Sequence, residues 1–279
     1  MSKLLDIDPG SFSSGFSERS FKVHHGLVDH PLLTIESIAL LADQLPAESV
    51  WRRAGNRAVG VAAAGEDPDR VAPSETIRGI EQNGRWVMLR FIEQVPQYAS
   101  LVNSCLDDVE PYLAGREGGM TQRNGYLFLS SPSAVTPVHF DSEHNLLLQI
   151  RGSKEVSISE FAGERARRQA IDRHWDRKQP DFDAMSAGAK HYDLQPGEGV
   201  YMAPFLPHWV ENGPSVSISL SIPFYTEVAL RAEQVNKVNA RLRRVHIHPR
   251  PVGRSESLDK VKAGLYKSGQ KIREVVKKR

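Results

Sequence analysis

The spacing of hydrophobic positions changes at about Gly125, and the two parts of the pattern predict different structures. Helices are expected over 34–45 and 96–108, and a loop over 62–70. Thr34 stands directly before the first of these hydrophobic patterns, where it can act as the N-cap. The first 120 residues therefore predict a mixed, mainly helical region that packs on the rest of the protein.

Beyond Gly125, short runs typical of β-strands alternate with Gly, Pro, Ser and Asn. The expected strands are 126–130, 145–150, 154–159, 199–203, 208–211 and 216–222. The last run, Val-Ser-Ile-Ser-Leu-Ser-Ile, alternates strictly, which is typical of a strand with one apolar and one small polar face. Many short strands at this spacing predict a mainly β fold, built as a sandwich or a barrel.

Helical patterns return at the end of the chain, after a charged insert at about 161–190 has interrupted the strands. Helices are expected over 226–244 and 258–277. In the last helix one stripe needs a partner surface and consists of Leu258, Val261, Leu265, Ile272 and Val276. The expected domains are 1–120, a core over 121–225, and a basic helical region over 226–279 that serves dimerisation or docking.

The composition is that of an ordinary globular protein, with 279 residues of which 40% are hydrophobic and 25% charged. It excludes collagen, disordered and coiled-coil proteins. No apolar run approaches the ~18 residues that a membrane span needs, and the N-terminus lacks the basic start and apolar stretch of a signal peptide. We therefore expect a cytoplasmic protein without a membrane partner. The single cysteine, Cys105, cannot form an internal disulfide or a thiolate zinc site, and we expect it to be buried.

The net charge of +2 hides an asymmetry. Residues 241–279 carry 13 Lys or Arg against three acidic residues, whereas residues 1–240 carry 23 against 31. A basic tail can bind nucleic acid, or it can dock on an acidic surface of its own or a second subunit. The sequence favours a homodimer over nucleic acid, because no interleaving of arginine and aromatic residues accompanies the charge.

The segment Thr-Pro-Val-His-Phe-Asp-Ser-Glu-His-Asn, residues 136–145, carries the most informative chemistry. In an extended strand His139 and Asp141 point to the same side, and they supply two of the three ligands of a facial triad that leaves positions open on Fe(II). Alone, this pair is more typical of an ordinary surface. The expected third ligand is His208, which follows a Gly- and Pro-rich corner; His144 competes for this role but has the wrong strand parity.

Lys154 and Thr136 offer groups that a co-substrate would need. A dicarboxylate that chelates the metal through a 2-oxo acid leaves its far carboxylate deeper in the fold, where an ammonium and a hydroxyl can hold it. An isolated lysine on an edge strand would instead be solvated. The position of Lys154 within the motif favours the binding role.

The run Thr136-Pro-x-His139-x-Asp141-x-x-x-Asn145, with the later Gln149, Gly152 and Lys154 and the distal His208, resembles the JmjC and cupin-like branch of the Fe(II)- and 2-oxoglutarate-dependent oxygenases. It is most similar to the asparaginyl hydroxylases that act on hypoxia-inducible factor. The resemblance implies a double-stranded β-helix, or jelly-roll, core with helices at both ends, and Fe(II), 2-oxoglutarate and O2 as cofactor and co-substrates. The metal ligands that it implies are His139, Asp141 and His208. The co-substrate residues that it implies are Thr136, Asn145 and Lys154, with Ser221 where the family often has Asn.

The expected activity is therefore hydroxylation of a protein side chain or a small metabolite, coupled to the decarboxylation of 2-oxoglutarate to succinate. Two alternatives stay open: a cupin-type ligand-binding or sensing module, and a metal-dependent cupin enzyme that does not use 2-oxoglutarate. The aromatic residues Trp86 and Tyr126 could form a substrate wall, although core packing is the favoured interpretation. Phe140 and Trp209 are expected to pack outside the cavity, and His24, His25, His246 and His248 are interpreted as ordinary polar residues.

Overall fold

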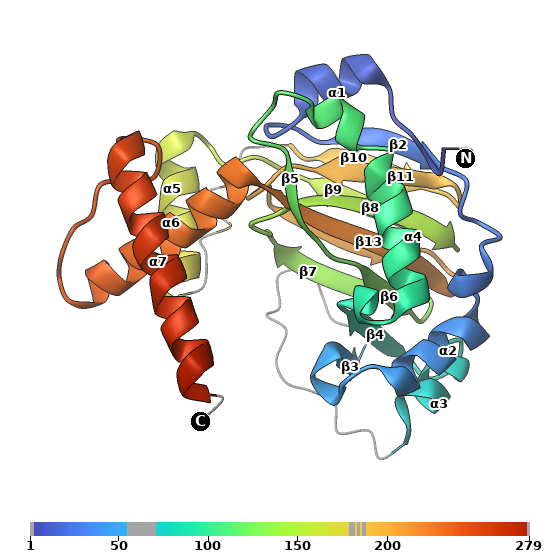
Figure 1. Cartoon of the computed structure of the whole chain (residues 1–279). Helices are drawn as coiled ribbons and strands as arrows, with labels where there is room; N and C mark the ends of the chain where they lie inside the picture. Colours follow the sequence, from blue (N-terminus) through green and yellow to red (C-terminus); the bar gives the residue numbers. More distant parts are fainter. Residues whose placement is uncertain (1–2, 55–70, 179–181, 183–184, 186–187, 278–279) are drawn as a thin grey trace.

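The computed structural model describes residues 3–54, 71–178, 182, 185 and 188–277, with the backbone alone for 272–277. The loop predicted over 62–70 lies outside these residues. Two antiparallel β-sheets dominate the described part (Figure 1). The larger contains, in spatial order, β1 (Leu5–Asp6), β2 (Phe21–His25), β11 (Glu198–Met202), β8 (His144–Arg151), β13 (Ser217–Thr226), β6 (Tyr126–Ser130), β4 (Arg85–Arg90) and β3 (Val50–Ala54), and β5 (Met120–Arg123) also pairs with β13. The smaller contains β10 (Lys190–Leu194), β9 (Lys154–Ile158), β12 (His208–Asn212) and β7 (Val135–His139).

The two faces of the larger sheet differ in chemistry, because successive side chains of a strand point to opposite sides. On β13, Ile218, Leu220 and Ile222 are fully buried in the main hydrophobic core. The serines between them lie on the other face, where Ser219 donates a hydrogen bond to the Gln149 side chain at 2.6 Å. The alternation therefore separates an apolar outer layer from a polar inner face.

Seven α-helices are present in the described part: α1 (Pro9–Gly15), α2 (Ile35–Gln44), α3 (Pro73–Arg78), α4 (Pro96–Asp107), α5 (Glu164–Trp175), α6 (Glu227–Arg244) and α7 (Glu256–Lys277). The predicted helices over 34–45 and 96–108 are confirmed, and Thr34 caps α2 by accepting a hydrogen bond from the Ser37 backbone N–H. Helix α4 buries an apolar face that includes Cys105, which is fully buried as expected.

Helices α5, α6 and α7 gather to one side of the two sheets (Figure 1). Helix α6 packs against both α5 and α7, and Arg243 of α6 fastens α5 through ion pairs to Asp172 at 2.7 Å and Asp176 at 2.8 Å. The insert therefore contributes its helix to a lobe with the C-terminal helices, which we call the C-terminal lobe (α5–α7).

The prediction of a mainly β jelly roll with helices at both ends is confirmed. The first 120 residues nevertheless contribute more strands than their pattern predicted, because β1, β2, β3 and β4 all join the larger sheet. Strand β3 carries Arg52 and Arg53 side by side, and such short, charged strands lack a clear alternating signal. None of the described helices has the length and apolar character needed to cross a membrane.

Candidate metal centre

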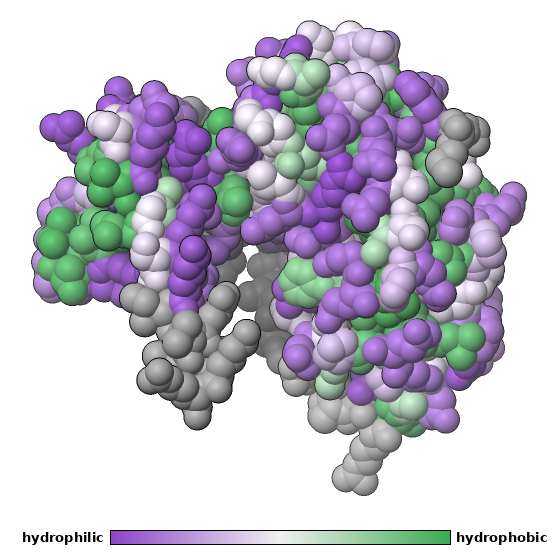
Figure 2. Space-filling model, in the orientation of Figure 1, coloured by the Kyte–Doolittle hydropathy of each residue, from purple (hydrophilic) through white to green (hydrophobic). Residues whose placement is uncertain are grey.

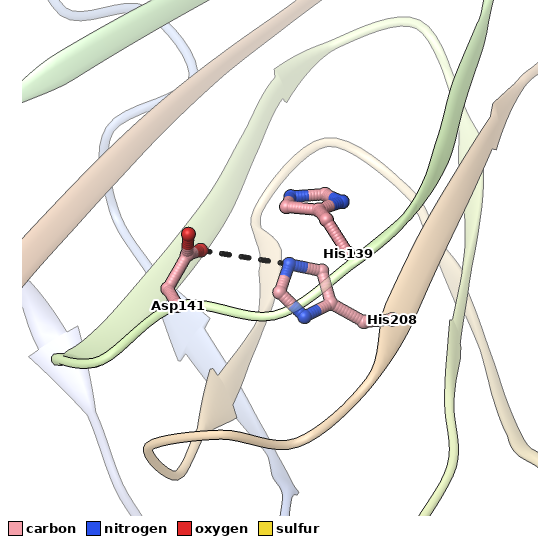
Figure 3. A group of neighbouring side chains, drawn as sticks. All are labelled: His139, Asp141 and His208. Carbon is pink, nitrogen blue, oxygen red and sulfur yellow. Dashed lines mark ion pairs between the residues drawn. The ribbon is translucent and has the colours of Figure 1, made fainter. Parts of the chain in front are cut away.

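His139, Asp141 and His208 come together at one end of the smaller sheet. His139 ends β7 and His208 begins β12, and the two residues face each other across the antiparallel ladder. Their imidazole rings lie 4.2 Å apart between centroids, and Asp141 Oδ2 lies 3.7 Å from His208 Nε2. One ligand atom from each residue falls within 4.8 Å of the others. Figure 3 shows the three side chains pointing toward one another.

Backbone carbonyls fix the tautomer of both histidines. His139 Nδ1 lies 2.8 Å from the Pro137 carbonyl oxygen, and His208 Nδ1 lies 2.9 Å from that of Leu206. A carbonyl oxygen can only accept a hydrogen bond, so each Nδ1 carries the hydrogen and each Nε2 keeps a free lone pair. Burial, and then the neighbouring His139, lower the pKa of His208, which keeps its ring neutral at pH 7. Both rings are therefore prepared to bind a cation through Nε2.

The donor set fits a divalent transition metal. Two neutral imidazole nitrogens and one carboxylate oxygen form the ligand set of a facial triad, which suits Fe(II) and leaves coordination positions open for small molecules. The three residues also line a narrow cavity between the two sheets, of about 60 Å³. A metal held here would therefore face a space that other ligands can enter.

His144, the alternative third ligand, lies elsewhere. It is 1% exposed on the outer face of the larger sheet, stacked between Phe16 and Phe224. Its Nδ1 lies 2.7 Å from the Tyr201 hydroxyl and its Nε2 lies 3.5 Å from Glu117 Oε2. Both ring nitrogens are thus engaged, and the preference for His208 based on strand parity agrees with this geometry.

Lys154 lines the same cavity and is an unusual residue to find there. It is 6% exposed, and among the described residues its ammonium has no hydrogen bond or ion pair. Burial lowers the pKa of Lys154 to about 7. A buried ammonium without a partner is costly, and an anionic group entering the cavity would offset that cost.

Thr136 also lines the cavity, although it lies three residues before His139 and regular alternation would place the two side chains on opposite faces. The pairing of β7 with β12 shows the reason. His208 pairs with His139 whereas Val210 pairs with Thr136, so β7 accommodates one extra residue in a β-bulge. The bulge turns both side chains to the same space.

Asn145 lines the cavity, whereas Ser221 is not among the lining residues. The Ser221 hydroxyl donates a hydrogen bond to Asn145 Oδ1 at 2.8 Å. Ser221 thus orients the Asn145 side chain, and its direct contact with a co-substrate stays a prediction. The Asn145 amide nitrogen is left to face the cavity as a donor.

The cavity also has lining residues that the sequence did not single out as site residues, and two of them matter most. Asn212 shares the face of β12 with His208, and its Oδ1 is buried without a hydrogen-bond partner among the described residues. Because Asn212 lies four residues after His208 in the same strand, strand alternation could have predicted that it faces the cavity. Trp86, for which core packing was favoured, lines the cavity beside Phe128. Tyr126 does not line it and instead meets Phe91 edge to face, while Phe140 packs outside among Phe161 and Phe205 as expected.

Two facing antiparallel sheets with this cluster between them define a jelly-roll protein of the cupin and JmjC fold class. No protein-family model matches the chain. A region of 108 residues is 33% identical to Jumonji C domain-containing protein 5 of Drosophila melanogaster, and it covers 33% of this chain and 26% of that protein. The chain thus matches about a quarter of that relative's length.

Solved structures with the same fold include the ribosomal oxygenase YcfD of Escherichia coli. It superposes on 97% of this chain and 68% of its own with a TM-score of 0.56, at 11% sequence identity. The structure of YcfD in complex with cobalt and 2-oxoglutarate gives a TM-score of 0.55 over 96% of this chain and 68% of its own, at 13% identity. At this level of identity, the likeness shows a shared fold.

Proposed function

We propose that the protein is an Fe(II)- and 2-oxoglutarate-dependent oxygenase that hydroxylates a protein side chain or a small metabolite. One observation carries the proposal: the His139–Asp141–His208 cluster lines the same cavity as the Lys154 ammonium, which has no partner among the described residues. A metal site alone would fit many cupins. A buried cation beside it fits a co-substrate with two acidic ends.

In this proposal His139, Asp141 and His208 hold the iron. Lys154 and the Thr136 hydroxyl bind the far carboxylate of 2-oxoglutarate, and Asn145 donates a hydrogen bond near its chelating end. When bound, the iron and 2-oxoglutarate supply the activation of O2, with 2-oxoglutarate converted to succinate and CO2 as one oxygen atom enters the substrate. The apolar lining residues Leu147, Met202 and Val210 exclude water from the reacting groups.

The comparisons support this class of chemistry without identifying a substrate. The partial relative carries the Jumonji C name, and the protein with the matching fold is described as a ribosomal oxygenase and was solved with 2-oxoglutarate and with succinic acid. The likeness to asparaginyl hydroxylases remains a prediction from the motif. A protein side chain remains one of two proposed substrate classes, alongside a small metabolite.

Anaerobic titration with Fe(II), with and without 2-oxoglutarate, tests the proposal. A weak visible charge-transfer band should appear only when both are present, because it requires the keto acid to chelate the iron. The band should be absent in His139→Ala and should need more 2-oxoglutarate in Lys154→Ala. If metal binds but no band forms at any 2-oxoglutarate concentration, the binding-module or non-oxoglutarate cupin alternatives replace this proposal.

We also propose that the C-terminal helices form a homodimer contact in the cytoplasm. Val261 and Leu265 of the predicted apolar stripe are 58% and 63% exposed, which is typical of a face that packs against a partner; the side chains of Ile272 and Val276 lie outside the described part. Removing residues 255–279 should halve the mass in solution. An unchanged mass would contradict the dimer and favour a nucleic-acid role for the basic tail.

A further inference from the structure

A second cavity, of about 400 Å³, lies within the C-terminal lobe (α5–α7), outside the candidate metal centre. It is built from the end of α5, one face of α6 and a single residue of α7. The side chains that give it its character are Trp175, Arg177, Lys237, Arg241, Arg244 and Tyr266. Lys237, Arg241 and Arg244 recur at helical spacing, so α6 presents all three to the same side. Figure 2 shows hydrophilic side chains over much of this lobe.

The charge of this cavity is not balanced by the described residues around it. Asp172 of α5 and Asp176, which directly follows α5, are both paired with Arg243, which does not line the cavity. Glu233 is paired with Lys237. Arg177, Arg241 and Arg244 form no ion pair with a described residue. The C-terminal ends of α5 and α6 carry only about half a negative charge each, which offsets about one of the three guanidinium charges.

The lining groups are mainly hydrogen-bond donors. Arginine and lysine side chains can only donate. The indole N–H of Trp175 is buried and has no acceptor among the described residues. Arg241 lies over the Tyr266 ring, 5.3 Å from its centroid, an arrangement that holds the guanidinium in place and leaves its edge N–H groups available. None of the described residues that line the cavity is acidic. A ligand that fits must therefore be rich in acceptors and negatively charged.

We propose that this cavity is a phosphate-binding site. A phosphate group offers several charged oxygens to donors that converge from two helices and the end of a third, whereas a single carboxylate would satisfy only one arginine. The phosphate could belong to a free phosphorylated compound or to the backbone of a nucleic acid. His174 also lines the cavity and contacts Phe140, with 5.1 Å between ring centroids. Phe140 stands between His139 and Asp141 in the sequence, so the cavity lies behind the segment that carries these two candidate metal ligands.

The test is direct binding to the full-length chain, which needs neither iron nor turnover. Calorimetry with inorganic phosphate and pyrophosphate measures the free-compound arm, and fluorescence anisotropy with a labelled single-stranded RNA measures the nucleic-acid arm. The double variant Arg241→Gln/Arg244→Gln removes two exposed guanidinium groups. Arg254→Gln is the matched control, because Arg254 is exposed in the same lobe but does not line the cavity. Arg241→Lys/Arg244→Lys keeps the charge and checks that any loss is not caused by unfolding.

We expect the double Gln variant to weaken binding about tenfold or more, the Lys variant to weaken it less, and Arg254→Gln to leave it unchanged. Binding of pyrophosphate would identify a free phosphorylated compound as sufficient. Binding of RNA alone, with affinity falling steeply as salt rises, would identify a nucleic-acid backbone. The proposal is overturned if neither ligand binds, if the double Gln variant binds as well as the unaltered chain, or if Arg254→Gln causes an equal loss.

Discussion

Two groups of histidine and carboxylate side chains differ in their surroundings, although His139 and Asp141 of one group lie close in sequence to His144 of the other. His139, Asp141 and His208 lie between the two sheets, and both histidines keep a free Nε2 directed at a cavity. His144 and Glu117 meet on the outer face of the larger sheet. There, both nitrogens of His144 have partners and aromatic rings cover its two faces.

Residue type and proximity alone therefore do not define a metal site. What separates the two groups is the partner of each ring nitrogen. A carbonyl at Nδ1 directs the lone pair of Nε2 into open space in the first group, whereas a hydroxyl and a carboxylate use both nitrogens in the second. The first group is prepared for binding and the second stabilises the fold.

The largest effect is expected at His208. Replacing it by Ala removes one of three ligands and should lower affinity for Co(II), used as a stable substitute for Fe(II), by about 1,000-fold. His144→Gln is the matched control and should change this affinity by less than about twofold. Calorimetric titration of both variants measures the contrast, and an equal loss in His144→Gln would remove the distinction between the two groups.

The next effect is expected at Lys154. Lys154→Met should lower 2-oxoglutarate affinity by about 100-fold through loss of charge-assisted hydrogen bonds, and leave Co(II) affinity unchanged. Burial lowers the pKa of Lys154 from 10.5 to about 7. Protonation of Lys154 therefore destabilises the folded state at pH values below 10.5, and this destabilisation grows as pH falls toward 7. The variant should therefore raise the free energy of unfolding by about 4 kcal/mol at pH 7.

Lys190→Met serves as the control for that experiment, since Lys190 is an exposed residue of the neighbouring strand β10. It should alter neither 2-oxoglutarate affinity nor stability appreciably. Urea denaturation and co-substrate titration measure both properties in the two variants. A Lys154→Met protein that binds 2-oxoglutarate normally would show that the co-substrate is held elsewhere or is not used.

A smaller effect, on stability alone, is expected at Glu117. Burial raises its pKa, but hydrogen bonds from His144, Ser17 and Thr226 outweigh it and lower the pKa to about 2. A carboxyl whose pKa falls from 4.5 to about 2 on folding stabilises the protein above pH 4.5 and loses this contribution as pH falls toward 2. Glu117→Gln should therefore cost about 2 kcal/mol at pH 7.

The loss of unfolding free energy in Glu117→Gln should become progressively smaller as pH is lowered from 4.5. Co(II) affinity at pH 7 should be unchanged. Urea denaturation at several pH values follows the difference in unfolding free energy between the variant and the unaltered chain. A difference that stays constant down to pH 3 would mean that Glu117 is not held ionised by its hydrogen bonds.

The smallest effect is expected at Ser221, which acts on the cavity only through Asn145. Ser221→Ala should weaken 2-oxoglutarate binding about threefold to fivefold, because the Asn145 amide loses the partner that orients it. Ser219→Ala is the control, since Ser219 bonds Gln149, which does not line the cavity. Equal affinities in the two variants would mean that Asn145 needs no such support.

Much of the candidate site could be predicted because it depends on local geometry. The i, i+2 spacing of His139 and Asp141 places both on one side of an extended strand whatever surrounds it. The same argument from strand parity disfavoured His144 as the third metal ligand. The helices could be predicted equally well, because their apolar spacing and the Thr34 cap are short-range signals.

Other features depend on contacts that no short window contains. Thr136 reaches the cavity only because β7 bulges against β12, and Trp86 reaches it only because β4 joins the larger sheet beside β6. The basic cavity requires α5, from the insert, to pack against α6, which begins more than fifty residues later in the chain.

Spacing and composition along the chain suffice to predict the strand and helix periods, the His-x-Asp pair and the charge of residues 241–279. Only the folded chain shows how closely the three ligands approach one another, which nitrogen of each ring stays free, and that Lys154 is buried without a partner among the described residues. The physical reason is that a side chain's hydrogen-bond partners and its access to water are set by strands and helices that are distant in sequence.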